Sequence, residues 1–295
     1  MNAFVDAIEG VAGLGALTLG YSLVEAQAFT TRQVEVAVLP KGAADLRVLH
    51  LSDLHITPAQ TRKIRWVNSL IEHQPDLVVV TGDFLAHQLA VPAVVEALGD
   101  LLNIPGMFVL GSNDYYAPYL KNPFIYFNKD HKGVTHNVRL PTEDLVQQLT
   151  DAGWHDLNNM QTQLVVNEVS IHARGTDDPH IHKDRYEQVA GAFNENTFAL
   201  GVTHAPYNRV LESFAKDSAD LVLAGHTHGG QVCIPFYGAL VTNCDLPTNQ
   251  AKGLSTFGGT EMPMHVSAGV GTSPFTPIRF ACRPEATLLT LKAKS

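Results

Sequence analysis

The stretch from Asp220 to Val232, Asp-Leu-Val-Leu-Ala-Gly-His-Thr-His-Gly-Gly-Gln-Val, decides how this chain is interpreted. A short apolar run precedes two histidines that are one residue apart. Side chains at positions i and i+2 of an extended chain point to the same side, so His226 and His228 can face one point. Two imidazoles at this spacing suit zinc, manganese or iron. Gly229 and Gly230 allow a sharp turn that leaves room for a ligand.

Four other apolar runs end in the same kinds of side chain. Because the chain has 14 histidines, a single His-x-His pair is weak evidence. The further runs lie at residues 46–51, 77–80, 107–110 and 198–202, and each is closely followed by Asp, Asn or His. Continuous apolar runs are typical of strands buried on both faces of a sheet. Ligands of α/β sheets bind beyond the carboxyl ends of such strands, so the sequence predicts one site formed by five strand ends.

Taken in order, the residues at these ends resemble the pattern of the calcineurin-like metallophosphoesterases, in particular a bacterial branch with an N-terminal hydrophobic segment. The matching blocks are Asp53-x-His55, Gly82-Asp83, Gly111-Ser112-Asn113-Asp114, Thr203-His204 and Gly225-His226-Thr227-His228. One block differs, because the family has Gly-Asn-His-Asp/Glu where this chain has Gly-Ser-Asn-Asp. The resemblance implies an α/β fold, a four-layer α-β-β-α sandwich with helices flanking two mixed sheets.

The resemblance also implies a reaction and its residues. It predicts a dinuclear-metal phosphoesterase, in which a metal-bridging hydroxide attacks a phosphodiester, phosphoanhydride or phosphomonoester. The implied metal ligands are Asp53, His55, Asp83, Asn113, His204, His226 and His228. Asp83 would bridge two divalent ions, and Asp83, His204 and Asn113 would be the catalytic residues. These oxygen and nitrogen ligands suit Mn, Fe or Zn.

The altered block leaves two questions open. Position by position, Ser112 takes the place of the family's ligand Asn, and Asn113 takes the place of its His. We favour Asn113 as the ligand, because an amide oxygen suits a hard cation better than a hydroxyl. The missing His would help to protonate the leaving oxygen, and His87 is an alternative donor. Two other functions stay open: a soluble cyclic-nucleotide phosphodiesterase, and a metal-binding scaffold that has lost turnover.

Composition limits the partners. The net charge of −9 argues against nucleic-acid binding, which needs a basic surface to neutralise phosphates. It does not exclude a phosphate-bearing small molecule or a lipid-linked substrate, because bound cations reverse the local charge. The three cysteines lack CxxC spacing, which favours a reducing compartment over a disulfide framework. Nothing in the sequence indicates an oligomeric state.

The N-terminal residues 1–31 contain no Lys or Arg and are interpreted as a segment separate from a catalytic domain at 32–295. The apolar run from Val11 to Val24 is shorter than the ~20 residues that span a bilayer. Two interpretations remain open, namely association with a membrane and a helix packed on the domain. If the segment enters a membrane, the basic residues that follow it place the domain in the cytoplasm, at the inner face.

Local patterns predict the remaining elements. Alternation and apolar periodicity predict helices at 61–73, 91–102, 142–152, 184–192 and 208–216, a strand at 33–39, a hairpin over 164–173, and strands at 231–234, 264–268 and 286–292. The βαβαβ order predicts a parallel sheet at the core. The aromatic stretch at 115–140 is interpreted as a lid or a packed loop. Residues 175–180 suggest a polar turn rather than a rim of the site, and Arg279 is a weak candidate for contacting phosphate.

Overall fold

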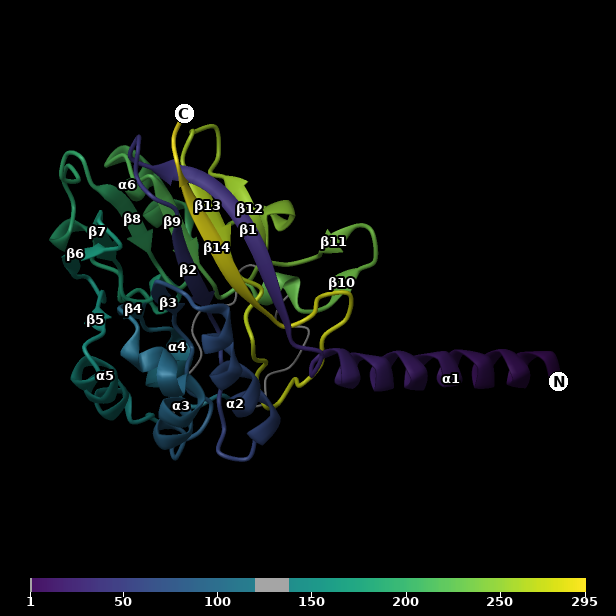
Figure 1. Cartoon of the computed structure of the whole chain (residues 1–295). Coiled ribbons are helices and arrows are strands. Elements are labelled where there is room, and N and C mark those ends of the chain that lie inside the picture. The colour runs from purple at the N-terminus through teal and green to yellow at the C-terminus, as the bar shows by residue number, and fades with distance from the viewer. Residues whose placement is uncertain (1, 120–137) are drawn as a thin grey trace.

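The computed structural model describes residues 2–119 and 138–295, and two six-stranded sheets form its centre (Figure 1). The first sheet has the order β1-β14-β2-β3-β4-β5. Its strands are β1 (Thr30–Leu39), β2 (Leu46–Leu51), β3 (Leu77–Thr81), β4 (Gly106–Val109), β5 (His155–Asp156) and β14 (Glu285–Ala293). The strands β2, β3 and β4 are parallel, whereas β14 is antiparallel to β2. The sheet is therefore mixed, with the predicted parallel core.

The second sheet has the order β12-β13-β9-β8-β7-β6. Its strands are β6 (Gln161–Val166), β7 (Val169–Gly175), β8 (Phe198–Val202), β9 (Leu221–Ala224), β12 (Gly253–Thr256) and β13 (Pro263–Val266). The strands β7, β8, β9 and β13 are parallel, and β6 and β12 pair antiparallel at the two edges. A small ribbon of β10 (Cys233–Ile234) and β11 (Gly238–Ala239) follows β9 in the chain.

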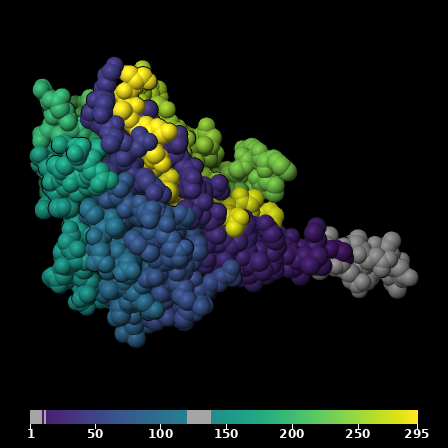
Figure 2. All heavy atoms as spheres, in the orientation of Figure 1, coloured from purple at the N-terminus to yellow at the C-terminus, as the bar shows by residue number. Residues whose placement is uncertain are grey.

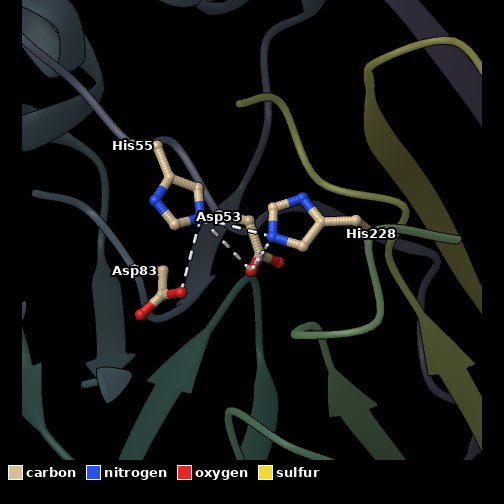
Figure 3. A group of neighbouring side chains, drawn as sticks. All are labelled: Asp53, His55, Asp83 and His228. Carbon is tan, nitrogen blue, oxygen red and sulfur yellow. Dashed lines mark hydrogen bonds and ion pairs between the residues drawn. The ribbon is translucent and has the colours of Figure 1, made fainter. Parts of the chain in front are cut away.

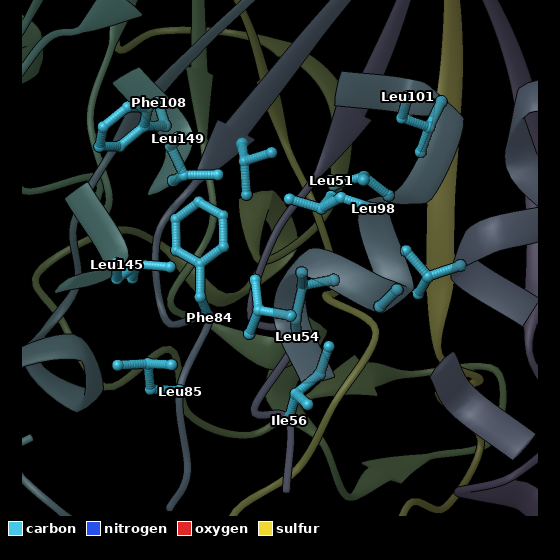
Figure 4. Close-up of a cluster of buried hydrophobic side chains, with 14 of the residues drawn as sticks. Leu51, Leu54, Ile56, Phe84, Leu85, Leu98, Leu101, Phe108, Leu145 and Leu149 are labelled. Atoms are coloured by element: carbon cyan, nitrogen blue, oxygen red, sulfur yellow. The ribbon is translucent and has the colours of Figure 1, made fainter. Parts of the chain in front are cut away.

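Helices cover the outer faces of both sheets, which confirms the predicted four layers. The helices are α1 (Asn2–Glu25), α2 (Thr61–Asn68), α3 (Val91–Leu98), α4 (Ser112–Tyr115), α5 (Thr142–Asp151) and α6 (Asn208–Lys216). The helices α2, α3 and α5 bury a cluster against the first sheet that includes Leu51, Leu98 and Leu145 (Figure 4). The helix α6 packs on the outer face of the second sheet through Phe214.

Alternation along the buried strands explains these layers, because successive strand residues point to opposite faces. In β3, Val78 and Val80 face the helices, while Leu77 and Val79 lie between the two sheets. In β9, Leu221 and Leu223 lie between the sheets, while Val222 and Ala224 face α6. Every one of these side chains is fully buried. An all-apolar strand is therefore what a sheet covered on both faces requires.

A pair of buried histidines joins the two sheets. His50 of β2 and His265 of β13 approach through their Nδ1 atoms, 2.9 Å apart, and His50 Nε2 lies 3.0 Å from Thr81 Oγ1. Burial holds the pKa of His50 well below its ordinary range and lowers the pKa of His265 to about 4. Both rings are therefore neutral near pH 7, and one Nδ1 donates a proton to the other.

Most predicted local elements are confirmed, but one helix is wrong. The helices expected at 61–73 and 91–102 each end in a 3-10 turn, Ser69–His73 and Gly99–Asn103. The segment 184–192 contains only the short turn Tyr186–Gln188. Asp217 accepts hydrogen bonds from the Tyr186 hydroxyl and from Gly191 N–H. These bonds to a side chain outside the segment replace the ladder that a helix would need.

The helix α1 projects away from the body of the protein (Figures 1 and 2). Its residues 13–21 are all exposed, so it is not packed along the domain. In the described part of the chain, no helix combines the length and the apolar character needed to cross a membrane. Thr30 and Thr31, the last two residues of the segment predicted at 1–31, pair with β14. Most of the aromatic stretch predicted at 115–140 lies outside the described residues.

The foot of α1 is fixed to the domain. The carboxylate of Glu25 accepts hydrogen bonds from the backbone N–H groups of Ala281 and Cys282, at 3.0 and 2.8 Å. The carbonyl oxygen of Ser22 accepts a hydrogen bond from Arg279 N–H. Tyr21 and Phe280 pack edge to face. The last turn of α1 therefore belongs structurally to the domain, although the rest of the helix does not.

Candidate metal centre

The predicted ligands gather where the strands of both sheets end. Asp53 and His55 follow β2, and Asp83 follows β3. The second sheet contributes His204 after β8, and His226 and His228 after β9. Backbone bonds connect these loops, since Asp53 N–H donates to Gly82 O and His55 N–H donates to Asp83 O. The expectation that separate strand ends converge is confirmed.

Four of these side chains form a compact group, in which three are buried and His228 is partly exposed (Figure 3). Asp53, His55, Asp83 and His228 each offer one ligand atom, and these atoms lie within 4.8 Å of one another. His55 Nε2 is 3.4 Å from Asp83 Oδ2, and His228 Nε2 is 3.4 Å from Asp53 Oδ1. The same two nitrogens are 3.3 Å apart. Such spacing surrounds a common point and suits a cation.

The protonation of this group also fits a metal. Burial, followed by the proximity of His228, lowers the pKa of His55 well below its ordinary value, and burial lowers the pKa of His228. Both imidazoles are thus neutral and carry a free lone pair, as metal ligation requires. Asp53 Oδ1 is buried and has no hydrogen-bond partner within the described residues. A buried carboxylate oxygen without a partner is costly unless a cation satisfies it.

A second group shares Asp83 with the first. His204 Nε2 lies 3.6 Å from Asp83 Oδ2 and has no hydrogen-bond partner in the described ranges. Its other nitrogen, Nδ1, is 2.6 Å from Thr81 O. The ring of His226 lies 5.2 Å from that of His204, and its Nε2 is 3.1 Å from Asn243 O. This leaves Nδ1 of His226 as the nitrogen that would face a cation.

The charge on His204 supports this placement. Burial alone would lower the pKa of His204, but the carboxylates of Asp83 and Asp178 raise it to about 9. The negative field at Nε2 therefore holds a proton when no other cation is bound. A divalent ion would replace that proton, because the site favours positive charge there. The donor set of this group thus also fits a metal.

The structure brings Asn113, rather than Ser112, to Asp83. Asn113 Nδ2 is 2.7 Å from Asp83 Oδ2, and Asn113 N–H donates to Asp83 Oδ1 at 2.8 Å. Because the two ends of an amide are assigned from its hydrogen bonds, a rotated Asn113 would present its oxygen at the same place. Ser112 opens α4 directly after Gly111. A side chain on Gly111 would clash, since an added Cβ would lie 2.3 Å from Asp83 Oδ1.

Asp114 is a positioning residue that is not among the ligands predicted from the sequence. Its buried carboxylate accepts N–H bonds from Asp83, Leu85 and Gly111, at 2.8, 3.0 and 2.9 Å. Burial and the neighbouring Asp83 raise its pKa to about 8. Asp114 therefore fixes the loop after β3 to the loop after β4. The acidic fourth position of the Gly-Asn-His-Asp/Glu pattern was the signal that pointed to it.

Ser52 orients Asp53 in a similar way. Its hydroxyl donates to Asp53 Oδ2 at 2.6 Å, and the N–H of His226 donates to the same oxygen at 3.0 Å. One carboxylate oxygen is thus held by hydrogen bonds from both sheets. The other, Oδ1, points toward His228. No sequence pattern marked Ser52.

The backbone at the candidate ligands is left-handed. Five of the seven have positive φ: Asp53 (50°), His55 (43°), Asp83 (55°), His226 (70°) and His228 (49°). Residues other than glycine avoid this region, at a cost of roughly 1–2 kcal/mol each. Strained backbone of this kind concentrates at functional sites. The surrounding loops therefore hold the ligands in place before any ion arrives.

The loop at 175–180 borders the site, so the expectation of an ordinary polar turn is wrong. The ring of His180 lies 4.5 Å from that of His226. Asp178 is fully buried, and its Oδ2 has no hydrogen-bond partner in the part of the chain described. Burial, partly offset by His204, raises the pKa of Asp178 to about 7. The loop therefore adds a carboxyl group and an imidazole beside the second group.

Arg279 is not available for phosphate, which corrects that expectation. Its side chain is fully buried. Its Nη2 donates to the carbonyl oxygens of Ala268, Gly269 and Gly271, at 2.7, 3.1 and 2.7 Å. The same nitrogen lies 3.4 Å from His228 Nδ1. Arg279 therefore holds a glycine-rich loop against a candidate ligand.

Comparisons with known proteins agree with this geometry. A family model described as calcineurin-like phosphoesterase matches residues 46–230, the range that contains all seven candidate ligands. The uncharacterized metallophosphoesterase YkuE of Bacillus subtilis is 27% identical, over 98% of this chain and 96% of its own length. Phosphodiesterase YaeI of Escherichia coli is also 27% identical, over 87% and 86%. A transmembrane protein with metallophosphoesterase domain from Bos taurus is 26% identical, over 90% of this chain but 57% of its own length.

Solved structures resemble the chain more distantly. An archaeal phosphodiesterase covers 76% of this chain, at 13% identity and a TM-score of 0.38. The protein TT1561 of Thermus thermophilus covers 77%, at 10% identity and a TM-score of 0.41. The assignment of a family therefore depends on the sequence match and on the arrangement of the site.

Proposed function

Because this chain belongs to the calcineurin-like phosphoesterase family, we propose that its centre holds two divalent cations with Asp83 as their shared ligand. The protein is a metal-dependent phosphoesterase and hydrolyses phosphate esters. The observation that carries the dinuclear proposal is the position of Asp83 Oδ2, which is 3.4 Å from His55 Nε2 and 3.6 Å from His204 Nε2. One carboxylate thus contacts both groups of ligands.

The proposed ligands divide between two sites. Asp53, His55, Asp83 and His228 would hold the first ion. Asp83, Asn113, His204 and His226 would hold the second. The mixture of carboxylate, amide and imidazole suits Mn, Fe or Zn. Metal analysis of the purified protein tests the number and the identity of the ions.

The residues of the chain prepare the site for an attacking water and a phosphate group. When bound, divalent cations activate the water and neutralise charge on the phosphoryl oxygens. Ser52 and His226 N–H orient Asp53, and Asp114 fixes the loop that carries Asp83. Positioning by such partners typically affects activity 10–100-fold. Asn113 beside Asp83 cannot supply a proton to the leaving oxygen, because an amide is not an acid near neutral pH.

We therefore expect a preference for substrates whose leaving group departs as a stable anion, such as aryl phosphate esters and phosphoanhydrides. Loss of a general acid typically costs ~10²–10⁴-fold for poor leaving groups. A panel of aryl esters, alkyl esters and anhydrides, assayed with Mn²⁺, measures this preference. Equal turnover of alkyl and aryl esters would contradict it and would point to another proton donor. His87, which lines a cavity of about 270 Å³ with Ala117 and Phe275, would then be replaced by Gln.

We also propose that α1 associates with the inner face of a membrane, so that lipid-linked phosphates are among the substrates. The support is the uncharged stretch from Gly10 to Val24 and the basic residues that follow it in the sequence. The exposure of residues 13–21 is consistent with contact to lipid. Partition of the full chain between buffer and vesicles tests this part of the proposal.

A further inference from the structure

A basic pocket lies at the foot of α1, apart from the metal centre. It has a volume of about 550 Å³ and is lined by Ala28, Phe29, Arg62, Arg65, Trp66 and Arg283. The arginine ion pairs in the described residues involve only Arg32, Arg174 and Arg209. The three arginines of the pocket are exposed, and no carboxylate lines it. The pocket therefore offers uncompensated positive charge in a protein whose net charge is −9.

The pocket is built on ordered groups. The rings of Phe29 and Trp66 are stacked, with their centroids 5.1 Å apart. Arg283 Nε donates to Ala28 O at 2.9 Å, which fixes the base of that guanidinium group. Arg62 and Arg65 lie on α2, whose inner residues Ile64 and Val67 are buried in the core. Guanidinium groups bind phosphate oxygens through paired hydrogen bonds, so the chemistry of this pocket fits a phosphate.

The helix α1, which precedes the pocket residues Ala28 and Phe29 in the chain, has an exposed apolar surface. Leu17 and Val24 are 74% and 68% exposed. From Gly10 to Val24 the helix carries no charge and extends about 22 Å, at ~1.5 Å per residue. This is less than the ~30 Å of a bilayer core but enough to enter one leaflet. Ala28 and Phe29 of the pocket lie three and four residues after Glu25, the last residue of α1, whose carboxylate is hydrogen-bonded to the domain.

We propose that this pocket binds the phosphate of an anionic phospholipid headgroup while α1 enters the lipid layer. Transfer of an exposed apolar helix into hydrocarbon is favourable, and arginines without a carboxylate partner attract anions. A membrane surface with anionic lipids supplies both at adjacent depths. The inference rests on the proposed membrane association of α1. It does not depend on the hydrolytic reaction, because none of the pocket residues belongs to the metal centre.

Sedimentation of the full chain with vesicles tests the proposal. One set of vesicles consists of phosphatidylcholine, and the other also contains phosphatidylglycerol. The variant Arg62→Gln/Arg65→Gln is compared with Lys41→Gln/Lys216→Gln, which removes the same charge at exposed positions that do not line the pocket. We expect tighter binding to the anionic vesicles. The arginine variant should lose about 30-fold in affinity, at roughly fivefold for each basic residue at an anionic surface, and the lysine variant should retain wild-type binding.

The outcomes separate the two levels of the inference. Absence of binding to either vesicle would overturn the membrane association of α1 and the pocket proposal with it. Equal binding of the wild type and the arginine variant to anionic vesicles would overturn only the pocket proposal. An equal loss in both variants would also overturn it, because the effect would then follow net charge alone. A dimer of the full chain in ultracentrifugation, together with no vesicle binding, would make a second copy the partner of α1.

The fluorescence of Trp66 distinguishes a lipid headgroup from free phosphate. The other tryptophan, Trp154, is buried, and Trp66→Phe identifies the signal. We expect brominated anionic lipids to quench Trp66, and we expect millimolar inorganic phosphate alone to have little effect. Saturation of the Trp66 signal by submillimolar phosphate, with no further change on adding vesicles, would show a free-phosphate site and overturn the proposal. Matching melting temperatures of all variants would establish that each is folded.

Discussion

Asp83 connects the two groups of candidate ligands. It contacts His55 and His204, and both its oxygens accept hydrogen bonds from Asn113. Its own N–H is held by Asp114. A carboxylate is suited to this position, because two anionic oxygens can neutralise two cations at once. Substitutions at Asp83 and in the altered block therefore test the proposed centre most directly.

We predict that Asp83→Asn loses at least one metal ion per chain and nearly all turnover. A neutral amide cannot provide a shared anionic oxygen. We expect activity to fall at least ~100-fold, because removing a residue that only hydrogen-bonds to a metal ligand already costs up to about 100-fold. Metal analysis and hydrolysis of an aryl phosphodiester measure the two effects. The exposed Asp144→Asn is the matched control. Activity near that of the wild type with two ions still bound would contradict the assignment.

The altered block gives a second prediction at this scale. Asn113→Ala should reduce the occupancy of the second metal more than Ser112→Ala, because Asn113 is the side chain bonded to Asp83. Metal content after dialysis against limiting Mn²⁺ gives the ranking. The opposite ranking would identify the Ser112 hydroxyl as the ligand. Equal occupancy in both variants would show that neither side chain binds the ion.

At the scale of elements, the site depends on where strands end and on how loops are fastened beyond them. Glu25 is a clear example, because it joins the end of α1 to the backbone at Ala281 and Cys282. Cys282 Sγ in turn lies 3.3 Å from His228 O. Glu25 at the end of the projecting helix is thus connected through Cys282 to the candidate ligand His228.

We predict that Glu25→Gln destabilises the protein by about 1–3 kcal/mol, since the charge-assisted acceptor of two backbone N–H groups, the buried one of Cys282 and the partly buried one of Ala281, is weakened. Unfolding in urea, with m-values compared, measures the change in free energy. Glu187→Gln serves as the control, because Glu187 is exposed. Identical midpoints for Glu25→Gln and the wild type would show that the contact contributes nothing to folding.

The sequence predicts these elements unevenly, for physical reasons. Apolar runs that end in ligands indicate β2, β3, β8 and β9, because burial on both faces leaves a clear pattern. The role of Arg279 could not be predicted, since its partners are backbone carbonyls that carry no sequence signal. The place of the loop at 175–180 could not be predicted for a related reason: its polar residues are typical of a turn, and only the fold brings His180 beside His226.

At the scale of the whole molecule, the centre lies at the junction of the two sheets. Asp53, His55 and Asp83 come from the first sheet, and His204, His226 and His228 come from the second. An ion bound by both groups would join the sheets in addition to the buried apolar side chains between them. Metal binding and the association of the sheets should therefore be thermodynamically linked.

We predict that removal of metal by a chelator lowers the melting temperature of the wild type. A free metal concentration of 100 times the dissociation constant stabilises the folded protein by about 2.7 kcal/mol for one site. Calorimetry with and without chelator measures the shift. Asp83→Asn should show a smaller shift, because it has less metal to lose. A chelator that strips the metal without moving the transition would contradict the linkage.

The histidine pair between the sheets predicts an acid-sensitive stability. The folded-state pKa of His265 is about 4, below the ordinary value of 6.5, so the unfolded chain binds more protons between these values. The stabilisation is therefore present above pH 6.5 and is lost as the pH falls toward 4, by on the order of 3 kcal/mol. His265→Gln can still bond to His50 and does not titrate.

Urea unfolding at pH 6.5 and pH 4.5, with chelator in every sample, checks this prediction. The chelator separates the effect from loss of metal at low pH. The difference in unfolding free energy between the two pH values should be smaller in His265→Gln than in the wild type. The exposed His87→Gln is the control. Equal differences in all three proteins would exclude His265 as a source of the acid sensitivity.

The left-handed backbone at five candidate ligands has a consequence for protein engineering. A library selected only for heat resistance, with a chelator present so that no metal contributes to stability, would accumulate glycine at these positions, because glycine adopts positive φ without penalty. Each such replacement would relieve strain and remove a ligand in the same step. Robust but inactive variants would dominate the output of the screen, as expected where stability and activity compete. Selection for heat resistance in this protein therefore needs turnover as a second criterion in every round.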